Sequence, residues 1–64
     1  MRFREARLKA GKSVQEVVNA LGVTDAAVYL WESGDITPRL ENLKKLSKLY
    51  GTTIDFLVSD PDDP

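Results

Sequence analysis

The chain has 64 residues, which is room for a single domain. No apolar stretch approaches the ~20 residues that are needed to cross a bilayer. The charged residues at the start are not followed by an apolar stretch, as they would be in a signal peptide. It contains no cysteine and no histidine, which excludes disulfide bonds and removes the usual ligands of a structural zinc ion. The net charge of −1 is unevenly spread, because the first 51 residues sum to +3 and the last 13 to −4. These features predict a cytoplasmic domain with no membrane segment, no metal and no cofactor.

Two helices are expected in the first third of the chain. The first spans about residues 2–10, where Phe3 and Ala6 begin an apolar face. The second begins at Ser-Val-Gln-Glu, residues 13–16, which is the Ser-x-x-Glu pattern of a capping box. It ends at Gly22, a residue that adopts the left-handed backbone conformation at little cost.

A third helix follows almost at once. Thr24 is a typical N-cap residue, and the helix is expected to run over residues 25–33 until Gly34 closes it. Val28 and Trp31 are three residues apart and therefore share a face. Trp31 could in principle stack on a nucleobase, but this spacing favours a place in the core.

Two further helices complete the predicted fold. The fourth spans about residues 39–50, with Pro38 at a first helical position, and the fifth is a short turn capped by Thr53. No stretch alternates apolar and polar residues, so no strand is expected. The prediction is an all-α protein: a compact five-helix bundle over residues 1–58, followed by a disordered acidic tail at 59–64.

The second and third helices are joined by Leu21-Gly22-Val23-Thr24. A turn of three to four residues containing glycine typically sets two helices at ~90–120°, which is the geometry of a helix-turn-helix. In such a unit, here about residues 14–33, the second helix can enter the major groove of DNA. An ordinary helical hairpin without a nucleic-acid partner fits the local pattern equally well.

Further motifs stand in a fixed order along the chain and bear on this choice. They are Gly11, Leu21-Gly22-Val23-Thr24, Val28-Tyr29, Trp31-Glu32-Ser33-Gly34, Pro38, Leu43-Lys44-Lys45-Leu46 and Gly51-Thr52-Thr53-Ile54-Asp55-Phe56-Leu57. With this set the chain resembles the Cro/C1-type (XRE-family) helix-turn-helix domain over about residues 2–58. The resemblance implies a lambda-repressor-like bundle that binds double-stranded DNA as a small transcriptional regulator, a repressor, with residues 25–33 in the major groove.

The same resemblance implies roles for individual residues. The positions that match base-facing residues of the family are Asp25, Ala26, Ala27 and Leu30. The positions that match phosphate contacts are Val14, Gln15, Thr24, Tyr29, Ser33, Gly34 and Arg39. Arg7 and Glu32 match a structural ion pair between the first and third helices; a direct contact of Arg7 with DNA is the less favoured alternative. Many relatives carry longer polar side chains at the base-facing positions, so Ala26, Ala27 and Leu30 differ from the usual pattern of the family.

Partners are expected on two levels. A homodimer would read two half-sites, and Ile54, Phe56 and Leu57 are candidates for its interface, although each could instead close the core of the monomer. The base-facing positions carry two alanines and a leucine, and the C-terminal end is acidic. A protein-interaction module or antitoxin-like partner of the same fold, with weak or no DNA binding, is therefore the alternative. An enzyme is not expected, because no catalytic arrangement of side chains is found.

Overall fold

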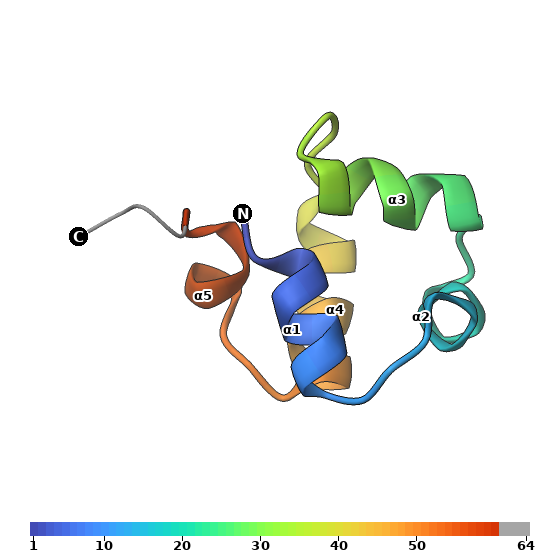
Figure 1. Cartoon of the computed structure of the whole chain (residues 1–64), viewed down its shortest axis with the longest axis horizontal. Coiled ribbons are helices and arrows are strands. Elements are labelled where there is room, and N and C mark those ends of the chain that lie inside the picture. Colours follow the sequence, from blue (N-terminus) through green and yellow to red (C-terminus); the bar gives the residue numbers. More distant parts are fainter. Residues whose placement is uncertain (61–64) are drawn as a thin grey trace.

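The computed structural model describes residues 1–60, and the described chain forms five helices and no strand (Figure 1). They are α1 (Phe3–Lys9), α2 (Val14–Leu21), α3 (Asp25–Ser33), α4 (Leu40–Tyr50) and α5 (Ile54–Val58). The predicted all-α, five-helix architecture is therefore confirmed. Residues 61–64, most of the expected acidic tail, lie outside the described part of the chain.

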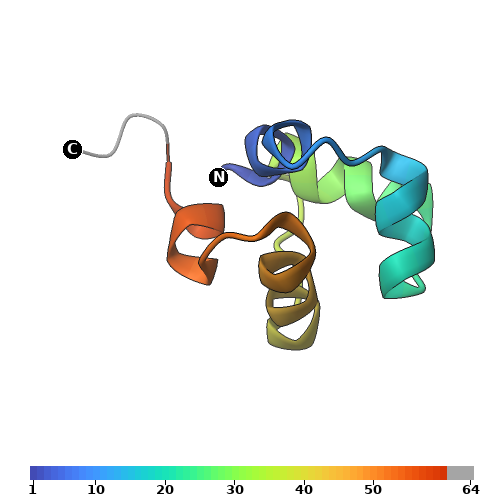
Figure 2. The same cartoon turned by 90° about the horizontal axis from the view of Figure 1, so that it is seen from below.

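The helices are arranged around α1 and α4. Helix α1 contacts α3, α4 and α5, whereas α2 contacts α3 and α4. Two views at right angles place α2 and α5 at opposite ends of the molecule, with α1 and α4 between them (Figure 1 and Figure 2). Helix α3 lies along one side of the molecule, near α2 (Figure 1). One face of α3 is therefore free of other helices.

A single apolar core holds the five helices together. Its buried members come from every helix: Phe3, Ala6, Val17, Leu21, Val28, Trp31, Leu43, Leu46, Tyr50 and Leu57. Trp31 is only 6% exposed, which confirms the expected core position, and Leu57 is fully buried. Leu57 thus belongs to the interior of the monomer and is no longer a candidate for a dimer interface.

The predicted capping box begins α2. The Ser13 hydroxyl accepts a hydrogen bond from the Glu16 N–H at 3.1 Å, and Glu16 Oε1 accepts one from the Ser13 N–H at 3.1 Å. The hydrogen bond from the Ser13 backbone lowers the pKa of the Glu16 carboxyl below its ordinary value. Two N–H groups at the start of the helix are thereby satisfied, and the direction in which the chain enters α2 is fixed.

Helix α4 begins one residue after the predicted start, and Pro38 does not take the predicted first helical position. Arg39 is the N-cap, with extended backbone, and its carbonyl oxygen accepts the first helical bond from the Leu43 N–H at 2.9 Å. Pro38 therefore precedes the cap and is not the first helical residue. The Pro38 side chain is buried.

The two ends of the described chain meet beside α5. Arg2 Nε donates to the Ser59 hydroxyl at 3.0 Å, and the Met1 ammonium group lies 2.9 Å from Asp60 Oδ1. The Arg2 N–H also donates to the Leu57 carbonyl oxygen at 2.8 Å. Residues 59 and 60 are thus tied to the start of α1.

Candidate nucleic-acid interface

The turn between α2 and α3 has the expected geometry. Gly22 adopts the left-handed conformation, with φ 70° and ψ 37°, and its N–H donates to the Val18 carbonyl oxygen at 2.9 Å. Thr24 is extended, and its hydroxyl accepts from the Ala27 N–H at 3.2 Å. Figure 1 shows α3 along its length and α2 end-on, so the two helices cross steeply and do not form one continuous rod.

This crossing leaves one face of α3 open to solvent. Ala26, Tyr29, Leu30 and Ser33 follow each other at helical spacing and are all exposed; we call them the outer stripe. Tyr29 is 57% exposed and Leu30 is 37% exposed. The opposite face supplies the two core residues of this helix, so α3 is held from behind while the outer stripe points away from the bundle.

The four predicted base-facing residues differ in their exposure to solvent. Asp25 and Ala26 are exposed in the first turn of α3, and Leu30 is exposed one turn later. Ala27 is half-buried and packs against the core, because it lies beside Val28 on the inner side of the helix. Only three of the four positions are therefore open to a partner.

Arg7 and Glu32 join α1 to α3. Arg7 Nε donates to Glu32 Oε2 at 2.7 Å and Nη2 donates to Oε1 at 3.1 Å, while Nη1 donates to the Lys12 carbonyl oxygen at 3.1 Å. The side chains are 11% and 8% exposed. The hydrogen bond to Glu32 raises the pKa of the Arg7 guanidinium. The geometry is that of the structural ion pair.

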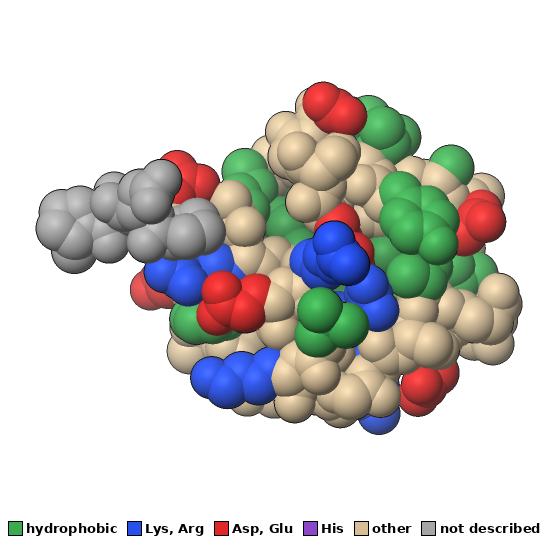
Figure 3. All heavy atoms as spheres, in the orientation of Figure 1, with side chains coloured by type: hydrophobic (Ala, Val, Ile, Leu, Met, Phe, Trp, Pro, Cys, Tyr) green, Lys and Arg blue, Asp and Glu red, His purple; other side chains and the backbone are tan. Residues whose placement is uncertain are grey.

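An open hollow of about 570 Å³ lies beside this pair. It is lined by residues of α1, the start of α2 and α3: Arg4, Arg7, Val14, Tyr29, Glu32 and Ser33. Figure 3 shows Lys and Arg side chains gathered near the middle of this face over α1, with hydrophobic side chains beside them over α2 and α3. The hollow thus joins a basic surface to the outer stripe.

Arg4 gives the hollow its uncompensated positive charge. Arg7 and Glu32 neutralise each other, whereas Arg4 is exposed and has no acidic partner within residues 1–60. The sequence indicated Arg4 only as one of several basic residues of the first helix. Its spacing of three residues from Arg7, which puts both on one face, was the available signal.

The predicted phosphate contacts divide between two places. Val14, Tyr29 and Ser33 line the hollow, and Gln15 is exposed next to them in the first turn of α2. The first N–H groups of a helix have no partner within it and favour anions. Gly34, with φ 86°, and Arg39 come after the C-terminal end of α3, next along the chain from Ser33; both are exposed, and neither lines the hollow. Thr24 is also exposed, but its hydroxyl is used as the helix cap.

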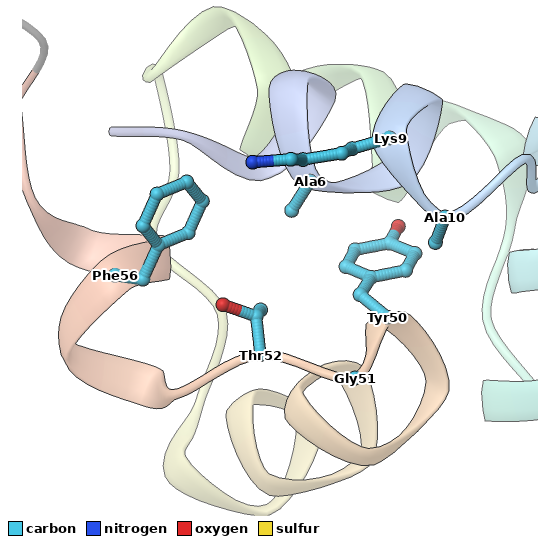
Figure 4. A pocket seen from close by; sticks show the side chains of 7 residues that line it. All are labelled: Ala6, Lys9, Ala10, Tyr50, Gly51, Thr52 and Phe56. Carbon is cyan, nitrogen blue, oxygen red and sulfur yellow. The ribbon is translucent and has the colours of Figure 1, made fainter.

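A second hollow, of about 370 Å³, lies between α1 and the segment from the end of α4 to α5 (Figure 4). It is lined by Ala6, Lys9, Ala10, Tyr50, Gly51, Thr52 and Phe56. Phe56 is half-buried beneath the Arg2 guanidinium, whose carbon is 5.3 Å from the ring centroid. Ile54 is also half-buried, so these two residues retain some surface for a partner.

Other kinds of site were also considered for the described chain. Residues 1–60 hold no group of three or more His, Cys, Asp and Glu side chains that could bind a metal ion. Among the five helices of this region, none is long and apolar enough to cross a membrane.

The family is established by comparison with known proteins. The Helix-turn-helix family model matches residues 3–57, which include all but one residue of the five helices. The chain therefore belongs to the helix-turn-helix family, in its Cro/C1-type branch, as the motifs in the sequence indicated.

Curated relatives are similar along nearly the whole chain. It is 37% identical over 59 residues to the cryptic phage CTXphi transcriptional repressor RstR of Vibrio cholerae, covering 92% of this chain and 53% of that protein. It is 38% identical over 63 residues to the HTH-type transcriptional activator BcrR of Enterococcus faecalis, covering 92% and 31%. It is 30% identical over 63 residues to the HTH-type transcriptional regulator PuuR of Escherichia coli, covering 98% and 34%. The chain thus spans about half of the first relative and about a third of the others, and no solved structure matches significantly.

Proposed function

We propose that the chain binds double-stranded DNA sequence-specifically as the DNA-binding part of a cytoplasmic transcriptional regulator. The observation that carries this proposal is the outer stripe of α3, exposed on a helix that the Gly22 turn sets across α2. An α-helix with its side chains is ~10–12 Å wide and fits a major groove ~12 Å wide. The names of RstR, BcrR and PuuR as transcriptional regulators support the same function.

Phosphate contacts from the hollow and from the segment after α3 would fix the position of α3 in the groove. The basic hollow with Arg4 and Tyr29 lies beside the free N–H groups of Val14 and Gln15. Arg39 is exposed where the chain leaves α3 for α4. Such contacts supply affinity and orientation, whereas base edges supply specificity.

Repression is the direction that we propose, because RstR, of which the chain covers a larger share than of BcrR, is named a repressor. We also propose a homodimer, since α3 has only nine residues and offers a short reading surface. Two copies would contact half-sites ~34 Å apart on one side of the duplex. Ile54 and Phe56, both half-buried on α5, are the proposed interface residues, and Phe56 also lines the hollow of Figure 4.

One observation favours a second candidate function. Tyr29 and Leu30 expose apolar surface on α3, and Asp25 places a negative charge beside them where DNA phosphates would approach. Such a face also suits a protein partner, as in a protein-interaction module of the same fold. DNA binding is preferred, because the basic hollow adjoins the same face.

The test is binding of the protein to a random pool of labelled duplexes, followed by selection of the bound sequences and measurement of anisotropy at two salt concentrations. DNA binding predicts an enriched sequence and an affinity that falls steeply with salt. Leu30→Glu should weaken binding strongly by placing a charge in the groove. Ala20→Glu is the control, because Ala20 is exposed in the last turn of α2 and belongs neither to the predicted contacts nor to the proposed dimer interface. Absence of binding to any duplex at low salt would favour the protein-interaction module.

A further inference from the structure

Three polar side chains at the two ends of α3 make hydrogen bonds within the protein. The Thr24 hydroxyl accepts from the Ala27 N–H at 3.2 Å, and Asp25 Oδ1 accepts from the Ala26 N–H at 2.9 Å. The Ser33 hydroxyl donates either to the Leu30 carbonyl oxygen at 3.1 Å or to Asp35 Oδ2 at 2.9 Å. These three side chains are thus held at the two ends of the helix, and none of them lies in its middle.

The remaining polar groups of the helix are directed elsewhere. Glu32 is buried in its pair with Arg7. Tyr29 lines the basic hollow together with Arg4, so under the proposed DNA binding its hydroxyl would meet a phosphate and not a base edge. What the outer stripe presents between Asp25 and Ser33 is thus the methyl group of Ala26 and the isobutyl group of Leu30.

We propose that α3 distinguishes base pairs through the C5-methyl groups of thymines, which contact Ala26 and Leu30. This inference rests on the proposed DNA binding and specifies which chemistry of the groove is recognised. In the major groove only thymine presents a methyl group, beside its O4 acceptor, and apolar side chains make their specific contact there. A guanine, adenine or cytosine at the same place offers only hydrogen-bonding groups that these two side chains cannot satisfy.

The spacing of the two residues limits where the thymines lie. Residues 26 and 30 are separated by four positions, or ~6 Å along the helix axis. Neighbouring base pairs are ~3.4 Å apart along the duplex. We therefore expect two thymines within one or two base-pair steps of each other in each half-site.

Replacing thymine with deoxyuridine tests the proposal at single positions. The probe is the duplex selected from the random pool, resynthesised with one uracil at a time. Uracil keeps the base-pairing groups and O4 and lacks only the methyl group. Affinity should fall about three- to fivefold at each of the two contacted thymines, the loss expected for one buried methyl group, and remain unchanged at thymines elsewhere. Replacing cytosine by 5-methylcytosine at these positions should recover part of the affinity lost on changing thymine to cytosine.

A variant assigns the effect to the side chain. Leu30→Ala should bind the thymine and uracil duplexes equally at one of the two positions, whereas Val58→Ala, with nearly the same exposure, should keep the full difference. Both side chains are partly exposed, and unchanged melting temperatures would verify folding. The proposal is overturned if the selected sequence has no thymine opposite α3, if uracil has no effect, or if Leu30→Ala retains the sensitivity. Failure to bind any duplex would instead refute the proposed function itself, and the inference with it.

Discussion

Arg7 of α1 and Glu32 of α3 form a buried ion pair with two hydrogen bonds, Nε to Oε2 at 2.7 Å and Nη2 to Oε1 at 3.1 Å. The pair ties α3 to α1 beside the hollow that Tyr29 and Ser33 of the outer stripe also line. Removal of one partner would leave a buried charge without compensation, which typically costs ~3–5 kcal/mol. We therefore expect Glu32→Ala to lower the free energy of unfolding by about 3 kcal/mol or more, measured by urea denaturation.

A double-mutant cycle separates the pair from other losses. Arg7→Ala together with Glu32→Ala should cost clearly less than the sum of the single changes, because neither charge is then left alone. Glu41→Ala, at an exposed position of α4, is the control and should change stability little. An unaltered melting temperature for Glu32→Ala would contradict this account of the ion pair.

Gly22 should tolerate a side chain only at the cost of backbone strain. A Cβ atom at this position would meet nothing within 4 Å, so the penalty comes from φ 70° alone. Gly22→Ala should lower stability by ~1–2 kcal/mol, the usual cost of a left-handed alanine. Gly22→Asn should cost less, because asparagine adopts this conformation more readily. Equal stability of the alanine variant and the natural chain would show that the turn relaxes to another geometry.

Tyr50 should make the fold sensitive to alkaline pH. Burial raises the pKa of the Tyr50 hydroxyl from 10.0 to about 12. Between these values the unfolded chain releases this proton while the folded chain retains it. Stability is then complete below pH 10 and declines as the pH rises towards 12. Tyr50→Phe should show a smaller decline over this range in thermal unfolding; an identical pH dependence would argue against the buried neutral hydroxyl.

Arg39 should contribute to DNA affinity through charge and not through the fold. Its side chain makes no capping hydrogen bond, so Arg39→Ala should leave the melting temperature almost unchanged. Loss of one phosphate contact lowers the slope of log affinity against log salt by ~1. Lys48→Ala removes an equal charge from the last turn of α4, ~13 Å along the helix, and should alter the slope less. Equal slopes for both variants would indicate a general effect of net charge.

The helix boundaries could be predicted because short-range patterns encode them. Ser13 and Glu16 are three residues apart and cap α2 by themselves, and Gly22 and Thr24 likewise determine the turn. Pro38 shows the limit of such patterns, because a proline is accepted both before the cap and just after it. In the structure Pro38 precedes the N-cap Arg39 and is buried.

The site was less accessible to sequence reasoning, because it depends on how helices pack. Arg7 and Glu32 are 25 positions apart, and only the family resemblance suggested that they pair. No local pattern shows that Arg4 and Tyr29 share one hollow, since α1 and α3 must first be docked. The rotation of α3 about its own axis also decides that Ala27 faces inwards while Ala26 faces out.

Amide NMR spectra recorded during titration with the selected duplex would test the central claim most directly. If the outer stripe of α3 lies in the major groove, the largest changes in chemical shift should fall at residues 24–34, with further changes at the start of α2 and near Arg39. Shifts confined to α5 and the last turns of α4, with α3 unaffected, would contradict the account.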